Sequence, residues 1–541
     1  MTSSIELPAA PTPSMAWDAW GNASERAPLS ESTRSMLEAA LGIATTHGPT
    51  RRVVGGPRLR RSRLAERRRR ALEAIVGAEH VSTDDAVRAF FLGGKSTFDL
   101  LARRSGAVQN APDAIVFPGT AEEIEAVLRY CSEEAVAVVP FGGGTSVVGG
   151  VDPVREWFDT VLTISTRRLC TMTNVDEFSR TATLQAGVTG PQAEEMLGRH
   201  GLTLGHYPQS FVYASIGGFA ATRSSGQASA GYGRFDDMVE SMSVVTPVGI
   251  THTGRAPASA AGPDLRQVFL GSEGTLGVIT SVTLRVHPVP ESTEYRSWWF
   301  PDFATGVGAL RVLAAHSGRP TVMRLSDEAE TAVDTALSSE HAADTPTGGC
   351  IAIATFDGSH ADAMVRATDA DAVVRLAGGE VLDADRARRW EHTRFDSPYL
   401  RDTLLDVGAV AETLETATSW SDLSRVRDAV TAALIDTLTS EGTPPIVMCH
   451  VSHVYATGAS LYFTVVFAAA DDPSTRLRVA KDAAVTASTG TGATVTHHHG
   501  VGRDHRQWMP EEIGHVGTTL LRAIKSAVDP AGVLNPGKLI P

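Results

Sequence analysis

The stretch PFGGGTSVVGG, residues 140–150, follows an apolar run typical of a buried strand and contains five glycines. Consecutive glycines leave backbone N–H groups unobstructed by side chains, and such a concave array suits the oxygens of a pyrophosphate. The stretch lacks the Rossmann fingerprint GxGxxG, because Val147 stands where the last glycine is required. A tight turn between two strands is the alternative interpretation of a single glycine loop.

Two further glycine-rich loops lie next to predicted strands, SIGGFAATRSSGQ at 215–227 and GSEGTLGVIT at 271–280. Three such loops in one region indicate a large ligand, such as a dinucleotide, that lies across several strand ends. GGKST at 93–97 is not interpreted as a P-loop, since Ala89 replaces the first glycine of that motif.

Composition indicates a globular enzyme with more than one domain. The chain has 541 residues, more than one hydrophobic core usually holds, with 42% hydrophobic and 20% charged residues. A net charge of −14 argues against a general nucleic-acid binder. Four widely spaced cysteines predict reduced thiols, and no signal peptide or membrane-span-length apolar run is recognised, so we expect a cytoplasmic protein.

One stretch, RRVVGGPRLRRSRLAERRRR at 51–70, carries ten arginines and one glutamate. We favour a solvated helix face or loop that pairs with acidic surface elsewhere. Peripheral contact with an anionic membrane surface is the alternative.

Hydrophobic patterns predict an α+β fold in four segments. Residues 1–107 are expected to form an N-terminal helical region, and 108–290 an α+β domain built around the glycine loops. Residues 291–490 are expected to form a second α+β domain, a cap with an antiparallel sheet covered by helices. Residues 491–541 are expected to form a C-terminal segment that returns to the ligand site.

The tract TVTHHHGVGRDH at 494–505 contains His497, His498 and His499 in succession. Histidine suits proton transfer because its pKa lies near neutrality. Neighbouring residues of an extended stretch point to opposite sides, so we expect His497 and His499 to share one face and His498 to point away. A metal site is the alternative; it needs ligands that converge from the fold, and we expect none.

The glycine loops also carry a family resemblance. PFGGGTSVVGGV, GHYPQSFVYASIGGFAATRSSGQ, YGRFDDMVESMSVVTPVG and GSEGTLGVITSVTLRVHPVPE resemble, in order and spacing, the FAD-binding domain of the vanillyl-alcohol-oxidase (PCMH) type of flavoenzymes. This resemblance implies FAD with its pyrophosphate on the first loop, and non-covalent FAD, because that loop has Thr145 and no histidine. The implied cofactor-binding residues are Pro140, Phe141, Gly142, Gly143, Gly144, Thr145, Ser146, Gln209, Ser215, Gly217, Gly218, Thr222, Arg223, Ser224, Glu273, Gly274, Thr275, Gly277, Val278 and Ile279.

A second set of motifs, AWDAWG, VMRLSD, FDSPYLRDTLLDVGAVAETLETATSW, CHVSHVYATGASLYFTV and HHHGVGRDH, resembles alkyldihydroxyacetonephosphate synthases and their bacterial homologues. The resemblance implies exchange of the acyl chain of acyl-dihydroxyacetone phosphate for a long-chain alcohol, through a covalent intermediate between the substrate and the flavin N5. It also implies a homodimer. An FAD-linked oxidase or dehydrogenase of a 2-hydroxy acid is the alternative activity on the same fold.

Site residues follow from the same resemblance. It implies Tyr462 and the three histidines as catalytic groups, and Arg401, Arg324 and His206 as substrate-binding groups. The alternative for each arginine is a structural ion pair, for Tyr462 a core aromatic, and for His206 a loop histidine bonded to backbone. Gln209 stands where eukaryotic synthases usually have aspartate, which leaves the substrate of this chain open.

Overall fold

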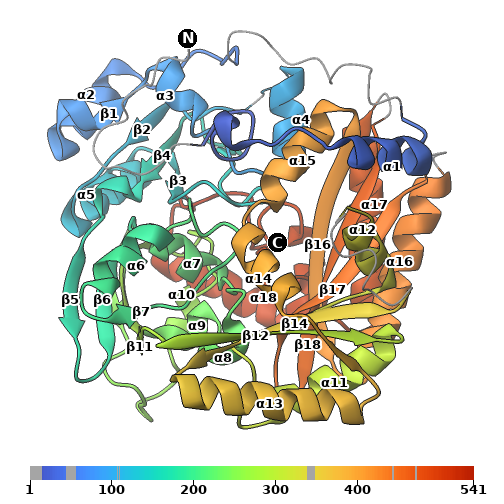
Figure 1. Ribbon diagram of the computed structural model, residues 1–541. Coiled ribbons are helices and arrows are strands. Elements are labelled where there is room, and N and C mark those ends of the chain that lie inside the picture. Colours follow the sequence, from blue (N-terminus) through green and yellow to red (C-terminus); the bar gives the residue numbers. More distant parts are fainter. Residues whose placement is uncertain are drawn as a thin grey trace.

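The protein is described by a computed structural model that covers residues 15–43, 57–106, 108, 110–337, 348–440, 444–469 and 472–541. In Figure 1, two small sheets occupy the left of the molecule and one large sheet the right. No helix within the described ranges is long and apolar enough to cross a membrane.

The left half contains two sheets around the glycine loops. The four-stranded sheet has the order β1 (Val81–Ser82), β2 (Ala114–Val116), β4 (Val161–Ser165), β3 (Ala137–Phe141), and its three longer strands run parallel. The second is an antiparallel sheet of five strands, β5 (Met172–Asp176), β6 (Thr181–Gln185), β10 (Val278–Arg285), β8 (Val239–Thr246) and β9 (Gly249–Thr253). A small pair, β7 (Leu202–Thr203) and β11 (His287–Pro288), lies beside them.

Helix α5 (Ala121–Glu133), which packs on the four-stranded sheet, shows why this part of the sequence was predictable. Ile124, Val127 and Leu128 are fully buried, as their helical spacing predicts. The Thr120 side chain caps the helix by accepting the Glu123 N–H at 3.1 Å. The Glu123 carboxylate in turn accepts the N–H of Gly119, the residue before the cap.

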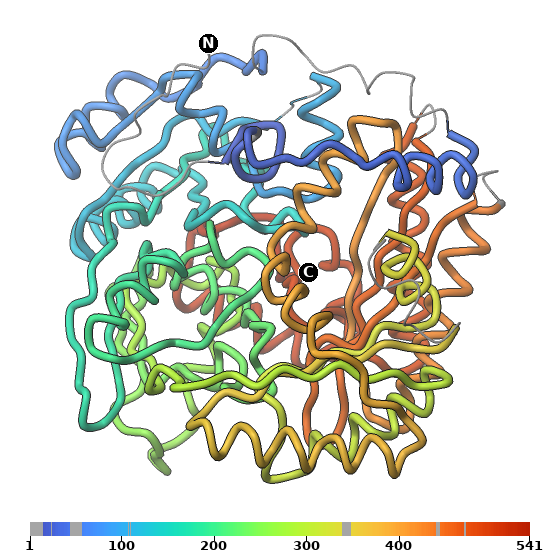
Figure 2. Tube along the Cα trace, viewed as in Figure 1, coloured from blue at the N-terminus to red at the C-terminus, as the bar shows by residue number. Residues whose placement is uncertain are grey.

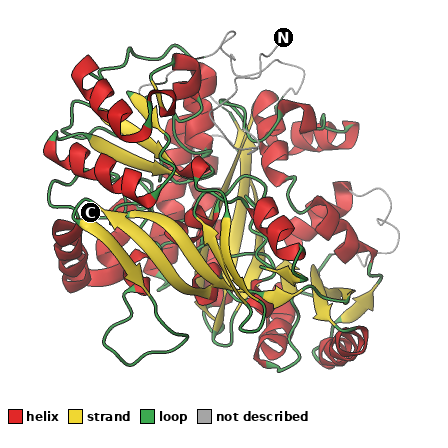
Figure 3. Ribbon diagram, turned by 90° about the vertical axis from the view of Figure 1, so that its left-hand side faces the viewer, coloured by secondary structure: helices red, strands yellow, loops and turns green. Residues whose placement is uncertain are grey.

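The right half is one antiparallel sheet of seven strands. Its order is β15 (Glu380–Leu382), β12 (Ser292–Phe300), β14 (Cys350–Gly358), β13 (Val322–Ser326), β17 (Ile446–Val454), β18 (Gly458–Ala468), β16 (Ala409–Ser419). Helices α11 (Phe303–Ala315), α13 (His360–Leu376), α16 (Leu423–Ser440) and α17 (Pro473–Gly490) pack on one face, as Figures 1 and 3 show. Helices α12 (Glu328–Leu337), α14 (Asp385–Thr393) and α15 (Ser397–Asp406) contact the sheet around the cavity described below.

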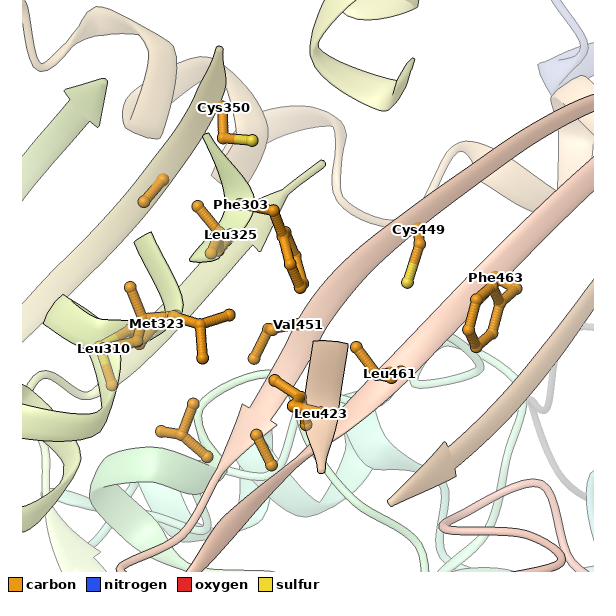
Figure 4. Packing of buried hydrophobic residues seen from close by; sticks show 14 of the residues in the cluster. Phe303, Leu310, Met323, Leu325, Cys350, Leu423, Cys449, Val451, Leu461 and Phe463 are labelled. Atoms are coloured by element: carbon orange, nitrogen blue, oxygen red, sulfur yellow. The ribbon is translucent and has the colours of Figure 1, made fainter. Parts of the chain in front are cut away.

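Side chains alternate between the two faces of this sheet. Met323, Leu325, Cys449, Val451 and Phe463 point into the core under α11 and α16 (Figure 4). The residues between them face the cavity, because successive strand residues point to opposite sides. One sheet therefore supplies both the main hydrophobic core and a wall of the site.

The C-terminal segment returns to the left half. The red tube in Figure 2 runs among the green and blue segments there. Helix α18 (Met509–Val528) packs Leu521, Ile524 and Val528 against the core of the five-stranded sheet. Beyond it, the backbone of Val138 in β3 accepts the N–H of Asn535 at 2.7 Å, so the tail extends the four-stranded sheet.

The N-terminal region is helical, with α1 (Glu31–Leu41), α2 (Glu66–Val76), α3 (Asp85–Ala89) and α4 (Thr97–Ser105). Arg67 to Arg70, on α2, form ion pairs with Glu66, Glu73 and Glu134, as expected of a solvated helix face. Arg51 and Arg52 lie outside the described residues. The remaining helices are α6 (Gly190–Gly198), α7 (Ile216–Thr222), α8 (Ser229–Tyr232), α9 (Phe235–Met238) and α10 (Arg266–Phe269).

Candidate active site

A cavity of about 710 Å³ lies between the three glycine loops and the seven-stranded sheet. Its floor on the loop side contains eighteen residues expected from the sequence: Pro140, Phe141, Gly142, Gly143, Gly144, Thr145, Ser146, Gln209, Ser215, Gly217, Gly218, Thr222, Ser224, Glu273, Gly274, Gly277, Val278 and Ile279. The loops that are far apart in sequence therefore form one continuous surface.

The first loop combines close packing with free backbone donors. A Cβ atom on Gly143 would lie 2.0 Å from the carbonyl oxygen of Tyr213, so only glycine fits there. Gly144 has a φ of +69°, which also favours glycine. The N–H groups of Gly143 to Ser146 have no acceptor within the described part of the chain. This array of unpaired donors fits the pyrophosphate of a dinucleotide.

Two buried side-chain amide atoms on the cavity wall also lack partners in the described residues. They are the amide nitrogen of Gln209 and the amide oxygen of Gln227. An unpaired polar atom in a buried position is costly unless a ligand or water satisfies it. Together with the first loop, they provide both hydrogen-bond donors and an acceptor for a polar cofactor.

Glu273 connects the third loop to the C-terminal segment. Its carboxylate accepts the N–H groups of Val501 at 2.6 Å and Gly502 at 2.7 Å. Burial raises the pKa of Glu273 to about 7 in spite of these bonds. The side chain of Asn535 donates to the carbonyl oxygens of Glu273 and Gly150, and so joins the first and third loops.

Two expected cofactor residues, Arg223 and Thr275, are absent from the cavity wall. Arg223 turns away because its guanidinium donates to the carbonyl oxygens of Leu270 and Gln267. The Thr275 hydroxyl is buried and donates to the carbonyl oxygen of Ser272 at 2.7 Å. Both side chains support the loops and do not line the cavity.

His206, expected as a substrate-binding group, lies behind the cavity wall. Its ring is fully buried between Phe219 and Phe235, at ring-centroid distances of 4.8 and 5.0 Å, and it does not line the cavity. Burial lowers the pKa of His206 to about 3, so the ring is neutral near pH 7. Its Nε2 lies 3.1 Å from the hydroxyl of Ser224, which does line the cavity. His206 therefore supports a loop rather than contacting a ligand.

Three neighbouring strands of the seven-stranded sheet place reactive side chains in one row. Tyr462 on β18 is paired in register with His450 on β17 and with Glu415 on β16. The rings of Tyr462 and His450 stack at a centroid distance of 5.0 Å. Tyr462 and His450 line the cavity, and burial raises the pKa of Tyr462 to about 12, so its hydroxyl keeps its proton near neutral pH.

Glu415 holds the histidine tract in place. Its buried carboxylate accepts the backbone N–H groups of His497, His498 and His499 at 2.5, 3.2 and 2.9 Å, and the hydroxyl of Thr496 at 2.5 Å. Burial opposes ionisation of Glu415, but the adjacent His498 and His499 rings and the Thr496 hydroxyl keep the pKa of its carboxyl below the ordinary value. The carboxylate is thus the centre around which the tract turns.

This turn contradicts the expected alternation of the histidines. Three successive N–H groups that point at one carboxylate require a turn, not an extended strand. His498 and His499 consequently line the cavity together, while His497 lies behind them. Burial lowers the pKa of His498, and it lowers that of His499 to about 3, so both rings are neutral near pH 7.

The two arginines predicted from sequence both line the cavity, and each also contacts one carboxylate. Arg324 donates to Glu330. Arg401 donates to the carbonyl oxygen of Lys95 at 2.7 Å and to Asp402 at 3.3 Å. The buried Nε of Arg401 has no acceptor in the described residues and is free for a ligand.

Three rings, those of His453, His497 and His498, each place a nitrogen within 4.8 Å of the others, a separation that a metal ion could bridge. Their hydrogen bonds argue for a different use. Nδ1 of His453 contacts the hydroxyls of Ser225 and Ser229, and both nitrogens of His497 have partners. Too few ring nitrogens are left for a four-coordinate site.

Sequence reasoning missed Glu415, His450 and Gln227. A signal for Glu415 was present, because Glu412 and Glu415 are the charged residues in an otherwise uncharged strand, AVAETLETATS. A charged residue inside such a strand is buried only if it is paired. Successive strand residues point to opposite faces, and the sequence does not show which face lines the site. It therefore left open which of the two glutamates faces it.

Comparison with known proteins agrees with this site. Residues 112–254 match the model of an FAD binding domain, and residues 289–539 match the C-terminal domain of FAD linked oxidases. Together with a relative that is 33% identical over most of the chain, these matches show that the chain belongs to the FAD-linked oxidase family. The free donors of the first loop accord with FAD as the cofactor.

Several members of this family and of this fold resemble the chain over most of its length. The alkyldihydroxyacetonephosphate synthase of Dictyostelium discoideum is 33% identical over 493 residues, which cover 87% of this chain and 80% of that protein. A solved alkyldihydroxyacetonephosphate synthase structure, 28% identical, has a TM-score of 0.83 and covers 97% of this chain and 98% of its own. p-Cresol methylhydroxylase, 16% identical with a TM-score of 0.67 over 87% and 96% of the two chains, shares the fold. The predicted PCMH-type FAD-binding domain with an antiparallel cap sheet is confirmed.

The Glu415→Gln substitution tests the anchor of the histidine turn. Glutamine offers one acceptor oxygen and an amide group that repels the N–H donors, so we expect a loss of about 3 kcal/mol of stability. Glu412→Gln, on the opposite face of the same strand, is the matched control. Burial raises the pKa of Glu412, so an uncharged amide should be tolerated there. Equal melting temperatures for the two variants would contradict this role.

A second prediction concerns acid stability. Folded His206 resists protonation down to a pKa of about 3, whereas the unfolded residue binds a proton below about 6.5. The unfolded state therefore binds more protons in this window, and this residue makes stability fall as pH decreases from 6.5 towards 3, by up to about 1.4 kcal/mol per pH unit. His206→Phe should melt with a weaker pH dependence between pH 7 and 5; an unchanged dependence would show that another group dominates.

Proposed function

We propose that this protein is an FAD-dependent alkylglycerone-phosphate synthase-like transferase. It exchanges the acyl chain of acyl-dihydroxyacetone phosphate for a long-chain fatty alcohol. The observation that carries this proposal is the composition of the cavity: the cofactor loops, the Tyr462–His498–His499 group and a long apolar wall all face the same space. A 2-hydroxy acid would need no such apolar wall.

The apolar wall suits an alkyl chain. It continues from the sheet into helices α12 and α15, and Leu404 and Val466 belong to a cluster that also includes Leu37 and Leu41 of α1. Burying a methylene group contributes about 0.8 kcal/mol, so a long chain gains much of its binding energy there. The apolar lining residues are Val333, Leu337, Ile351, Ile353, Leu400, Leu404, Met448 and Val466.

Arginines provide the complementary charge. Arg401 offers its unpaired Nε, and Arg324 lines the same cavity. A guanidinium binds phosphate oxygens through several N–H groups at once. Arg401 therefore suits the phosphate of the substrate, while Arg324 is held by Glu330 and orients His450.

The histidine turn suits removal of a proton from the carbon next to the ketone. His498 and His499 are neutral and cavity-facing, which a general base requires. Tyr462, protonated and stacked on His450, can donate a hydrogen bond to the developing oxyanion. When bound, FAD supplies the reactive ring system that this exchange depends on.

Non-covalent attachment of FAD is part of the proposal. The first loop has Thr145 where a tethering histidine would stand, and its backbone donors supply binding without a covalent link. Precipitation of the yellow protein with acid should release all FAD into the supernatant. Colour that remains in the pellet would contradict this expectation.

Transfer itself is tested with acyl-dihydroxyacetone phosphate and radiolabelled hexadecanol. We expect label in an ether product, and loss of about 10²- to 10⁴-fold in rate for His498→Ala and Tyr462→Phe, with FAD retained. His515→Ala, at an exposed histidine of α18, and Tyr130→Phe, whose hydroxyl has no partner in the described residues, are the controls. Anaerobic bleaching of the flavin by a 2-hydroxy acid, without ether product, would assign a dehydrogenase instead.

A further inference from the structure

A chain of hydrogen bonds leads from the cavity wall outward through the histidine turn. Nδ1 of His498 lies 2.9 Å from Nδ1 of His497, and Nε2 of His497 lies 2.5 Å from the hydroxyl of Tyr455. His498 lines the cavity, His497 is buried behind it, and Tyr455 is partly exposed. Tyr455 begins the hairpin turn between β17 and β18, and the next two residues are exposed.

We propose that His498, His497 and Tyr455 form a proton relay that connects the buried base to solvent. The proposal rests on the proposed function insofar as the relayed proton is one removed from the substrate. It adds two groups, His497 and Tyr455, that do not themselves line the cavity. His497 is accordingly not a second base, although the family resemblance implied for it the same role as for its neighbours.

Each transfer in the relay is balanced. His498 takes the substrate proton on Nε2 and passes the proton on its Nδ1 to Nδ1 of His497. His497 then passes the proton on its Nε2 to the Tyr455 oxygen, whose own proton leaves to water. One proton has moved outward, both rings are neutral again with exchanged tautomers, and the reverse sequence returns a proton to the substrate side.

The surroundings keep these rings aligned. The backbone of His497 is bonded to Glu415, and its ring stacks on His453 at a centroid distance of 5.0 Å and an angle of 26°. His453 is in turn fixed by the hydroxyls of Ser225 and Ser229, at 3.1 and 2.8 Å. Rings that cannot rotate freely keep the hydrogen-bond distances short, which proton transfer requires.

The surroundings of the relay keep His497 and Tyr455 uncharged, so neither group retains a transferred proton. Burial and the neighbouring His498 hold the pKa of His497 well below its ordinary value, with Arg234 contributing in the same direction and Glu415 opposing it. Burial raises the pKa of Tyr455 to about 12, although Arg234 beside it acts against this. Neither group holds a net charge near neutral pH, so a proton that enters the chain moves on.

The test is Tyr455→Phe in the FAD-loaded protein, with Tyr130→Phe as a matched control. Phenylalanine keeps the ring and removes only the outer hydroxyl. We expect turnover to fall about tenfold, which is less than the loss of a general acid or base itself causes. KM and FAD content should not change. The ratio of turnover in H₂O to that in D₂O should rise in Tyr455→Phe alone, because proton exchange becomes limiting. Equal turnover and equal ratios in the two variants would overturn the relay.

A second measurement is independent of the substrate. In resting, FAD-loaded protein with ¹⁵N-labelled histidine, Tyr455→Phe should shift the ring nitrogen resonances of both His497 and His498, because the two rings share a proton. A shift confined to His497 would overturn the relay. If the wild type gives no ether product, the proposed transferase fails, while the resonances still decide whether the hydrogen-bonded chain exists.

Discussion

One buried carboxylate determines the geometry of this site. Glu415 lies on the cavity side of β16 and accepts four hydrogen bonds from consecutive residues of the C-terminal segment. A buried charge is stable only when such donors surround it, and the donors have no other acceptor there. The histidine tract must therefore turn around Glu415, and this turn brings two imidazoles into the cavity and places a third behind them. The proposed base, its partner and the proposed outward path all depend on that one interaction.

The same C-terminal segment also secures the cofactor loops. Glu273 accepts two N–H groups immediately after the histidine turn, and Asn535 bonds to the backbone of the first and third loops. A chain segment that touches the loops at one end and the seven-stranded sheet at the other couples the two halves of the molecule. The position of the histidines relative to the glycine loops thus follows from backbone hydrogen bonds rather than from side-chain packing alone.

Alternation within the strands explains how one sheet serves both stability and chemistry. On β17, Cys449 and Val451 fill the core while His450 faces the cavity. On β18, Phe463 is in the core while Tyr462 stacks on His450. Such strands read as nearly continuous apolar runs with an occasional polar residue, and the polar residues are those that the site uses.

Much of this organisation was predictable from sequence. The glycine loops, the strand runs and the capped helix α5 depend on local backbone conformation and on periodicity, which short stretches encode. His206, Arg223 and Thr275 do not line the cavity, because a motif places a residue near a site without specifying where its side chain points. Arg324 likewise pairs with Glu330, a partner that no sequence motif indicated.

The sequence by itself determined that the chain would build a glycine-lined site for a dinucleotide, an antiparallel cap sheet and a cluster of titratable side chains. Only the tertiary structure decided which histidines face that site. The residue that orients them lies 82 positions before His497 in the chain, so no local pattern could report it. The extended conformation expected for HHHG was overridden because satisfying one buried carboxylate is worth more than the preference of four residues for a strand.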